Sequence, residues 1–481
     1  MAVEYDLIVI GASKEGIYAA LTAARFNARV ALIEQGISTH NYAWGEIIHS
    51  RTLSHKTRLN QFLQREKLAQ KETFSTPNQL LAAGEWATEV LFTLAEESAS
   101  PVLAAAGVDV IQGLGEFVRL PKPAFVVEKR RLLARAYLLA TASHSTIPEV
   151  AGLKEISYLK IEDIWQENSS QFLPESLIIV GGNIRGIVLA QNLAQLGKKI
   201  TLVIPDERIL PAEDLEAAML IQAELEAQKV RIITQSLITQ VKKIGETKWV
   251  QAGNRALETQ EVIFVGEKQP NIAGLNLASV GVEFSNQGVK VNEKLQTTNP
   301  QIYACGDVIG GYQFPHLAEY EAKIALKNVL FLPLFKVDYR YLPWAIFTEP
   351  NLARVGLTEA QARQRYGKEI FVVREYFQSN PRAQILGQTT GFCKFVIRRK
   401  GEILGAHIVG VEAGEIISAI AVAMQQKIKL SDLAKIYFPS PTLAEIIAKT
   451  AREWEKQRLS QNQTLLNFCD TFFDFRRNWS K

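Results

Sequence analysis

The feature that most constrains the fold is a strand, a glycine-rich turn and a helix that occur twice in the chain. The first copy begins with the apolar run Tyr5–Ile10, turns at Gly11–Gly16 and continues into an alanine-rich segment. A second apolar run, Arg29–Ile33, follows and ends at Glu34. This order is typical of the βαβ unit that binds a dinucleotide, with the phosphates at the N-terminus of the helix.

Four positions of the first copy have predicted roles. Gly11 permits the tight turn, Gly16 lets the helix approach the strand, and Glu34 can accept a hydrogen bond from a ribose hydroxyl. Ser13 stands where a middle glycine normally lets the backbone approach the pyrophosphate. We therefore expect the cofactor to lie slightly further out, or the local backbone to shift.

The second copy has the same order but a weaker nucleotide signature. The run Ser176–Val180 leads into Gly181–Gly186, a helix and another strand. The position equivalent to Glu34 is Ile204, and an isoleucine cannot bind a ribose hydroxyl. The fold is thus duplicated, while nucleotide binding at this copy stays open. Its candidate contacts to NAD(P)H are Gly181, Asn183 and Gly186.

A third segment favours FAD as the cofactor of the first copy. Residues Thr297–Val308 form an apolar strand that runs into Gly306 and Asp307. This geometry puts a carboxylate at the C-terminal edge of a strand, beside the first nucleotide site. Asp307 is therefore predicted to bind the ribitol of the flavin.

The order of these segments resembles that of the class I pyridine nucleotide-disulfide oxidoreductases, the family of dihydrolipoamide dehydrogenase, glutathione reductase, mercuric reductase and soluble transhydrogenase. The resemblance covers roughly residues 3 to 455. The family's crossover is matched by Ala140–Ser143, where the resemblance implies that Thr141 and Ala142 contact FAD, with Ala142 in place of glycine. Gly266, in a segment similar to the family's return to the FAD domain, is a further candidate contact to NAD(P)H.

The resemblance implies an α/β fold with two Rossmann-like dinucleotide-binding domains, as in glutathione reductase, plus a C-terminal α+β dimerisation domain. It also implies a homodimer. The predicted domains are a discontinuous FAD-binding domain at 1–150 and 278–335, an NAD(P)-binding-like domain at 151–277, an interface domain at 340–458 and a helical tail at 459–481.

The residues that carry the family's chemistry are substituted. Its redox-active CxxxxC cysteines fall at Asn41 and Glu46, neither of which can form a thiolate, so no mixed disulfide can form there. The family's lysine near flavin N5 falls at Ser50, and the glutamate that pairs with it falls at Val188. The histidine of its HPTxxE motif is replaced by Ser440.

Two functions remain open. The first is an FAD-dependent NAD(P)H oxidoreductase, diaphorase- or transhydrogenase-like, that passes electrons to a non-disulfide acceptor, because a flavin can exchange hydride without a disulfide. Glu46 would then be the candidate catalytic residue: in an apolar pocket at the flavin edge, desolvation would favour its protonated form as a proton donor. A Glu46 that points to solvent is the other interpretation. The alternative function is a non-catalytic FAD-binding sensor or docking protein.

Composition excludes several other classes. A net charge of +4 over 481 residues makes no concentrated basic face, so nucleic acid is not an expected partner. No apolar run is long enough to cross a membrane, and Glu4 and Asp6 before the first strand are unlike a signal peptide. The 3 cysteines form no CxxC pair and the 6 histidines have no ligand spacing, so no metal site is predicted. We expect a cytoplasmic protein.

The tail has its own pattern. Leu465, Cys469, Phe472 and Phe473 fall on one stripe of a helix. The simplest prediction is that this stripe packs on the surface of the dimer. Because basic residues flank the aromatic ones, contact with a partner or a membrane surface is the alternative.

Overall fold

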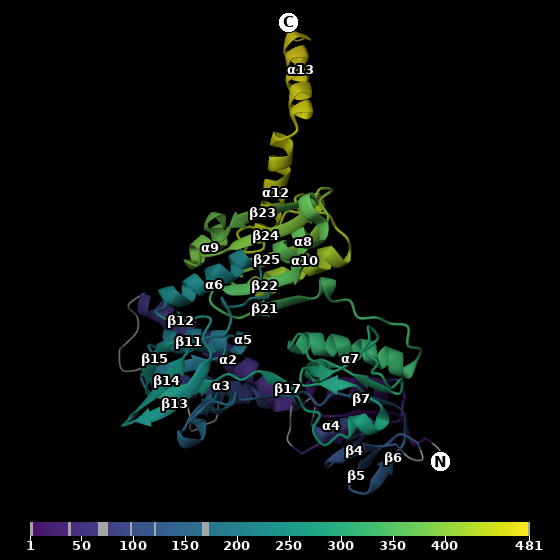
Figure 1. Ribbon diagram of the computed structural model, residues 1–481. Coiled ribbons are helices and arrows are strands. Elements are labelled where there is room, and N and C mark those ends of the chain that lie inside the picture. Colours follow the sequence, from purple (N-terminus) through teal and green to yellow (C-terminus); the bar gives the residue numbers. More distant parts are fainter. Residues whose placement is uncertain are drawn as a thin grey trace. The chain divides into compact units, whose positions relative to one another are not determined.

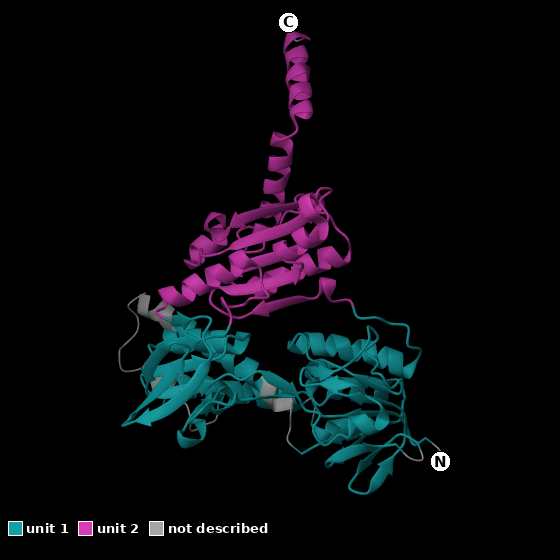
Figure 2. Cartoon of the chain, in the orientation of Figure 1, with its two compact units in different colours: residues 1–205, 230–337 teal, residues 206–229, 338–481 magenta. Residues whose placement is uncertain are grey.

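The chain forms two compact units, each built from helices and strands (Figures 1 and 2). The structure, a computed structural model, describes residues 3–36, 40–65, 76–96, 99–119, 122–165 and 173–479. Unit 1 comprises Met1–Pro205 and Val230–Val337, and unit 2 comprises Asp206–Lys229 and Asp338–Lys481.

The first sheet of unit 1 is parallel and has the order β20-β7-β1-β2-β3. Its strands are β1 (Tyr5–Ile10), β2 (Val30–Glu34), β3 (Val108–Gln112), β7 (Ala134–Leu139) and β20 (Ile302–Ala304). Leu7 and Val9 pack in one core with helices α1 (Lys14–Arg25) and α7 (Pro315–Leu330), while the alternate residues of β1 pack in a second core on the other face. Because both faces of the sheet are covered, successive residues of each strand are buried, and the strand sequences are continuous apolar runs.

Smaller elements surround this sheet. Helix α2 packs along α3, and β4, β5 and β6 form an antiparallel sheet. The bounds of these elements are α2 (His40–Arg65), α3 (Thr76–Glu96), α4 (Ser100–Ala105), β4 (Gly115–Val118), β5 (Ala124–Val127), β6 (Arg130–Leu132), β8 (Ser143–Ser145), β17 (Lys268–Pro270), β18 (Phe284–Ser285) and β19 (Gly288–Val289).

The second sheet of unit 1 is also parallel, with the order β12-β11-β10-β16-β9. Helix α5 (Ile184–Gln195) follows its glycine turn, and an antiparallel sheet of β13, β14 and β15 lies beside it. The strands are β9 (Leu159–Lys160), β10 (Ser176–Val180), β11 (Lys199–Val203), β12 (Arg231–Ile233), β13 (Ile238–Ile244), β14 (Thr247–Ala252), β15 (Arg255–Thr259) and β16 (Glu261–Phe264).

Unit 2 is built on an antiparallel sheet with the order β21-β22-β25-β24-β23. One face carries an apolar core shared with helices α10 and α12. The elements are α6 (Leu215–Ala227), β21 (Pro343–Ile346), β22 (Asn351–Gly356), α8 (Glu359–Tyr366), β23 (Ile370–Tyr376), α9 (Pro381–Leu386), β24 (Phe392–Arg398), β25 (Ile403–Gly410), α10 (Ala413–Gln425), α11 (Leu430–Leu433), α12 (Glu445–Ser460) and α13 (Gln463–Trp479).

An ionic cluster explains why the segment Asp206–Lys229 groups with unit 2. Lys394 of β24 is buried and donates to Asp214, just before α6, at 3.0 Å. Arg354 and Glu213 form a second buried pair at 3.5 Å. Because a buried charge is costly without its partner, these contacts hold α6 to the sheet of unit 2.

The predicted fold class is confirmed: two parallel dinucleotide-binding sheets precede a C-terminal unit of antiparallel strands and helices. The first sheet is discontinuous in sequence, since β20 joins strands from the start of the chain. The exact domain boundaries stay a prediction.

Candidate functional site

The first glycine turn brings the loop after β1 against the loop after β7. Gly11 has φ +105°, and a Cβ atom there would collide with the carbonyl oxygen of Ala140. A Cβ on Gly16 would collide with the carbonyl oxygen of Gly11. Both positions therefore require glycine for close backbone packing.

Ser13 has a role that the sequence analysis missed. It is the N-cap of α1, and its Oγ accepts a hydrogen bond from the backbone N–H of Gly16 at 3.3 Å. A serine followed by a helix is the usual signal for such a cap. The residue that interrupts the glycine motif thus begins the helix.

Glu15 is a buried carboxyl group at the same helix terminus. A Cβ on Gly306 would collide with its Oε1, so the Glu15 side chain lies directly against the turn before Asp307. Burial raises the pKa of Glu15 to about 7, against hydrogen bonds from its own backbone and from Ser13 that lower it. Near neutral pH the protonated and the ionised form of Glu15 are therefore both well populated.

Asp307 follows β20 and lies beside the crossover after β7. Its Oδ2 accepts hydrogen bonds from Ser143 Oγ at 2.6 Å and from Lys268 Nζ at 3.4 Å. The backbone N–H of Gly306 donates to Glu321 Oε2 at 2.8 Å. These contacts orient the Gly306–Asp307 turn toward the other strand ends of the sheet.

The crossover contains two further predicted residues. Thr141 is buried, and its Oγ1 has no hydrogen-bond partner within the described part of the chain. Ala142 has φ +55°, a left-handed conformation that glycine adopts without steric cost. Ala142 therefore holds a backbone conformation in which an alanine is more strained than a glycine would be.

These residues fit a bound FAD. Glu34 ends β2, and Gly11, Thr141 and Asp307 come shortly after other strands of the same parallel sheet. Ligands of such sheets bind at the carboxyl ends of the strands. Glu34 accepts from Gln112 Nε2 at 3.4 Å and is partly exposed. The unpartnered Thr141 hydroxyl offers a polar contact inside the site, which supports this fit.

The second glycine turn repeats the backbone geometry of the first. Cβ atoms on Gly181 and Gly186 would collide with backbone carbonyl oxygens, and one on Gly266 with that of Thr146. Asn183 is the N-cap of α5 and accepts from the N–H of Gly186 at 3.1 Å.

The residue of the second copy that is equivalent to Glu34, and would contact a ribose, is the apolar Ile204. Ile204 is fully buried, and a Cβ on Gly182 would lie 2.7 Å from its Cγ2. Ile204 therefore packs directly beneath the turn. The carboxylate that usually binds the adenine ribose has been replaced by a packing contact.

An ion cluster joins helices α2 and α5 and corrects the prediction for Glu46. Glu46 Oε1 accepts from Arg185 Nε at 2.6 Å, and its side chain is only 11% exposed. The same guanidinium donates to Ser145 Oγ at 2.9 Å and to Glu162 Oε1 at 2.7 Å. The prediction of an apolar pocket is therefore wrong, because Arg185 pairs with Glu46, and the prediction of a solvent-facing side chain is wrong as well. The role of Glu46 as a proton donor stays a prediction.

The charges of this cluster stabilise one another. Burial alone would raise the pKa of Glu162, but the hydrogen bond from Ser145 and the positive charge of Arg185 outweigh it and hold that pKa below its ordinary value. Burial likewise opposes the charge of Arg185, yet the two carboxylates raise its pKa above its ordinary range. Glu162 and Arg185 are therefore both ionised at neutral pH.

Hydrogen bonds extend the contact between α2 and α5. Asn192 Nδ2 lies 3.4 Å from Ser50 Oγ, Ser54 Oγ donates to Asn192 Oδ1 at 2.9 Å, and Thr57 Oγ1 donates to Gln195 at 3.0 Å. At the positions of the family's lysine and glutamate, Ser50 takes part in this polar row and Val188 is buried. The side chain of Asn41, at the first cysteine position, lies outside the described residues.

Arg185 is a site residue that the sequence prediction did not include, although it lies within the second glycine turn. An arginine inside the second glycine turn, together with an acid at the cysteine position, was the available signal. The two residues are far apart in sequence, so their contact becomes visible only through the fold.

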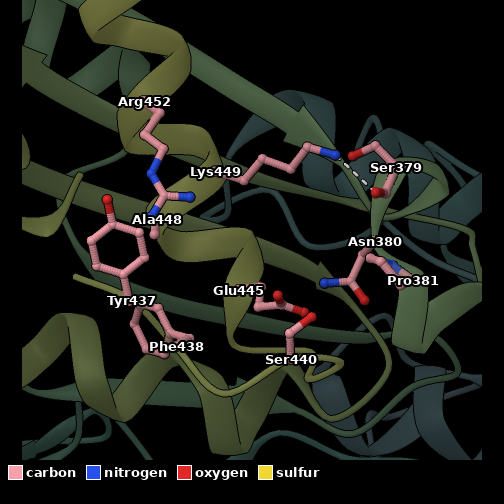
Figure 3. Close-up of a pocket in the computed structure, with 10 residues that line it drawn as sticks. All are labelled: Ser379, Asn380, Pro381, Tyr437, Phe438, Ser440, Glu445, Ala448, Lys449 and Arg452. Atoms are coloured by element: carbon pink, nitrogen blue, oxygen red, sulfur yellow. Dashed lines mark hydrogen bonds between the residues drawn. The ribbon is translucent and has the colours of Figure 1, made fainter. Parts of the chain in front are cut away.

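The position of the family's histidine lies at a cavity of about 400 Å³ in unit 2 (Figure 3). Ser440 and Glu445 line it, and Lys449 Nζ donates to Ser379 O at 2.8 Å across one side. Glu445 Oε2 accepts from the backbone N–H of Thr442 at 2.9 Å, which holds the turn before α12. Glu445 thus has a structural role that does not depend on a histidine.

Comparisons with known proteins agree with this geometry. Residues 5–322 match the family model described as pyridine nucleotide-disulphide oxidoreductase, and residues 342–451 match the dimerisation domain of the same family. A mercuric reductase of Staphylococcus aureus is 29% identical over 459 residues, which cover 94% of this chain and 83% of that protein. A dihydrolipoyl dehydrogenase of Bacillus subtilis (strain 168) is 29% identical over 460 residues, covering 92% and 96%.

Two solved structures are similar over nearly the full chain. LpdA from Mycobacterium tuberculosis superposes with a TM-score of 0.83 at 25% identity, covering 93% of this chain and 99% of that one. The HOCl-induced flavoprotein disulfide reductase RclA from Escherichia coli, in a Cu(II) complex, gives 0.82 at 25% identity, covering 94% and 99%.

Proposed function

The chain belongs to the pyridine nucleotide-disulphide oxidoreductase family, and on that premise we propose that it is an FAD-dependent NAD(P)H oxidoreductase whose electron acceptor is not a disulfide. Members of this family are FAD-dependent flavoproteins that use NAD(P)H. The activity would be diaphorase-like or transhydrogenase-like.

The observation that carries the proposal is the ion pair between Glu46 and Arg185. The second cysteine position of the family is occupied by a carboxylate that is already bound to a guanidinium. Two of the three cysteines do not replace it, because Cys305 and Cys393 are buried and burial raises the pKa of each thiol. A thiol that stays protonated is a poor nucleophile and reductant.

The proposed roles of the residues follow from their positions. The N-terminus of α1 and the turn at Gly11 would hold the phosphates, Glu34 the adenine ribose and Asp307 the ribitol. Bound FAD would supply the hydride and electron transfer chemistry. Gly181, Asn183, Gly186 and Gly266 would form the weaker NAD(P)H contact.

Anaerobic spectroscopy tests this proposal. We expect NADH or NADPH to bleach the flavin absorbance of the purified protein, and ferricyanide or a quinone to restore it. Lipoamide and oxidised glutathione should not restore it. Cys469→Ser is the matched control, because Cys469 is partly exposed, and it should behave as the parent. Turnover of either disulfide substrate by the parent and by this variant would refute the proposal.

The second candidate function is a non-catalytic FAD-binding sensor or docking protein on the same fold. Ile204 favours it, because an apolar residue packed beneath Gly182 offers no hydrogen bond to a nicotinamide cofactor. In that case FAD would bind, and neither nicotinamide nucleotide would bleach it.

We also propose that the protein is a cytoplasmic homodimer. The match to a dimerisation domain over residues 342–451 supports the dimer. Free cysteines suit a reducing compartment. Light scattering of the purified protein should give twice the mass of one chain, and a mass of one chain would exclude the dimer.

A further inference from the structure

Lys268 of β17 is a largely buried cation beside the turn predicted to bind FAD. Its side chain is only 11% exposed. Within the part of the chain that the structure describes, its Nζ has one hydrogen-bond partner, Asp307 Oδ2, at 3.4 Å. A lysine ammonium carries three N–H donors. Because burial of a charge is costly unless the charge is hydrogen-bonded, this ammonium can bind a further acceptor.

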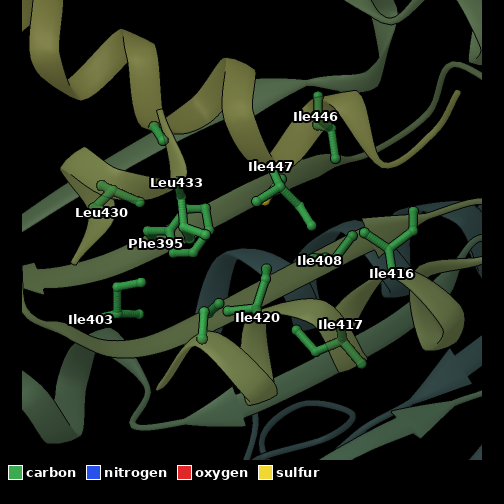
Figure 4. Packing of buried hydrophobic residues seen from close by; sticks show 14 of the residues in the cluster. Phe395, Ile403, Ile408, Ile416, Ile417, Ile420, Leu430, Leu433, Ile446 and Ile447 are labelled. Carbon is green, nitrogen blue, oxygen red and sulfur yellow. The ribbon is translucent and has the colours of Figure 1, made fainter. Parts of the chain in front are cut away.

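Lys394, a buried lysine of unit 2, is bonded more completely. It precedes Phe395, which lies in the apolar core of that unit (Figure 4). Its Nζ lies 3.0 Å from Asp214, 3.3 Å from Glu216 and 2.8 Å from Glu359. The ammonium of β17 has one longer contact in place of these three, so its capacity for hydrogen bonds is available to a ligand.

Two acceptors lie close to Lys268 in the fold. The hydrogen bonds that Asp307 accepts from Ser143 and Lys268 both go to Oδ2, which leaves Oδ1 as an acceptor. Thr141, two residues before Ser143, has a buried hydroxyl without a partner among the described residues. Asn271, directly after β17, donates to the carbonyl oxygen of Thr141 at 2.9 Å. The crossover and β17 therefore lie side by side at this site.

The chemistry of the three groups indicates what they bind. The Asp307 carboxylate only accepts hydrogen bonds, the Lys268 ammonium only donates them, and the Thr141 hydroxyl does both. A chain of hydroxyl groups can donate and accept at each carbon, so a polyol matches all three. A phosphate matches less well, because its negative charge would be repelled by Asp307. The polyol of FAD is its ribitol.

We propose that Lys268 binds the ribitol of FAD, as a donor beside the carboxylate of Asp307. The inference rests on the proposed function in one respect, that FAD occupies this site. It does not depend on NAD(P)H or on the electron acceptor. It adds to the site a residue that the sequence prediction did not include.

Calorimetric titration of the FAD-free full chain with FAD and with ADP tests the proposal. ADP carries the adenosine and the two phosphates of FAD but no ribitol. Lys268→Gln should weaken FAD binding by at least about tenfold, because a charge-assisted hydrogen bond is lost, and should leave ADP binding unchanged. Lys268→Met carries the same expectation and serves if Lys268→Gln does not fold. The control Lys154→Gln removes an exposed charge of unit 1 and should bind both ligands as the parent does.

Ser143→Ala separates ribitol binding from the orientation of Asp307. Ser143 donates to the same Oδ2 at a shorter distance but carries no charge, so its loss should weaken FAD binding less than Lys268→Gln does. The inference is overturned if Lys268→Gln binds FAD as the parent does, if it loses as much affinity for ADP as for FAD, or if Ser143→Ala loses as much affinity for FAD. These results leave the proposed function intact, whereas a parent that binds neither ligand would refute both.

Discussion

At the residue scale, Glu15 is a buried carboxyl group beside the turn predicted to bind FAD. It occupies the N-terminus of α1, where the helix dipole favours negative charge. With its pKa raised to about 7, the side chain is a neutral carboxyl through the mildly acidic range. In that neutral form Glu15 would not compete with the phosphates of FAD for the positive end of the helix dipole.

Glu15 therefore predicts a pH dependence of stability. The folded pKa of about 7 exceeds the ordinary 4.5, so the native state holds a proton that the unfolded chain releases, and stability falls as pH rises from about 4.5 to 7. The loss attributable to Glu15 is about 3 kcal/mol. In FAD-free protein, urea unfolding of Glu15→Gln should show a smaller decline than the parent.

The control for this measurement is Glu4→Gln, which removes the same charge from an exposed position of unit 1. The stability of Glu4→Gln should fall with rising pH by as much as that of the parent. Equal pH profiles for the parent and Glu15→Gln would contradict the assigned protonation.

At the element scale, the contact between α2 and α5 depends on Arg185. Arg185→Gln leaves Glu46 and Glu162 as partly buried carboxylates without their cation, which should lower the free energy of unfolding by about 3 kcal/mol. Adding Glu46→Gln should recover part of that loss, because one unpaired charge disappears. Urea unfolding of both variants measures this, with exposed Arg135→Gln as the control. If the loss in the double variant equals the sum of the losses in Arg185→Gln and Glu46→Gln, the two residues are not energetically coupled.

The elements predictable from sequence were those that local patterns specify. Apolar runs followed by glycine turns gave β1, β10 and the helices after them, because a parallel sheet needs both features within one short segment. The site residues at the strand ends followed from the same rule. The environment of Glu46 did not, since its partner Arg185 comes from the second copy of the unit. The grouping of α6 with unit 2 depends on Lys394 and Asp214, which lie even further apart in sequence than Glu46 and Arg185.

At the scale of the whole molecule, every residue predicted to bind FAD lies in unit 1. A ligand stabilises only the folded unit that binds it. We expect calorimetry of FAD-free protein to show that FAD, added at about a hundredfold excess over its dissociation constant, stabilises unit 1 by about 3 kcal/mol. The transition of unit 2 should not move. A common shift of both transitions would show that the units unfold together.

Helix α6 packs in unit 2 but lies in the sequence between the two segments of unit 1, and this has a topological consequence. The backbone passes from one unit to the other at Pro205–Asp206, Lys229–Val230 and Val337–Asp338. A protease that cleaves only at the last junction would leave the Lys394 cluster still tethered through α6 to the N-terminal fragment. The two fragments of the cleaved chain would then stay associated until α6 dissociates from the sheet of unit 2.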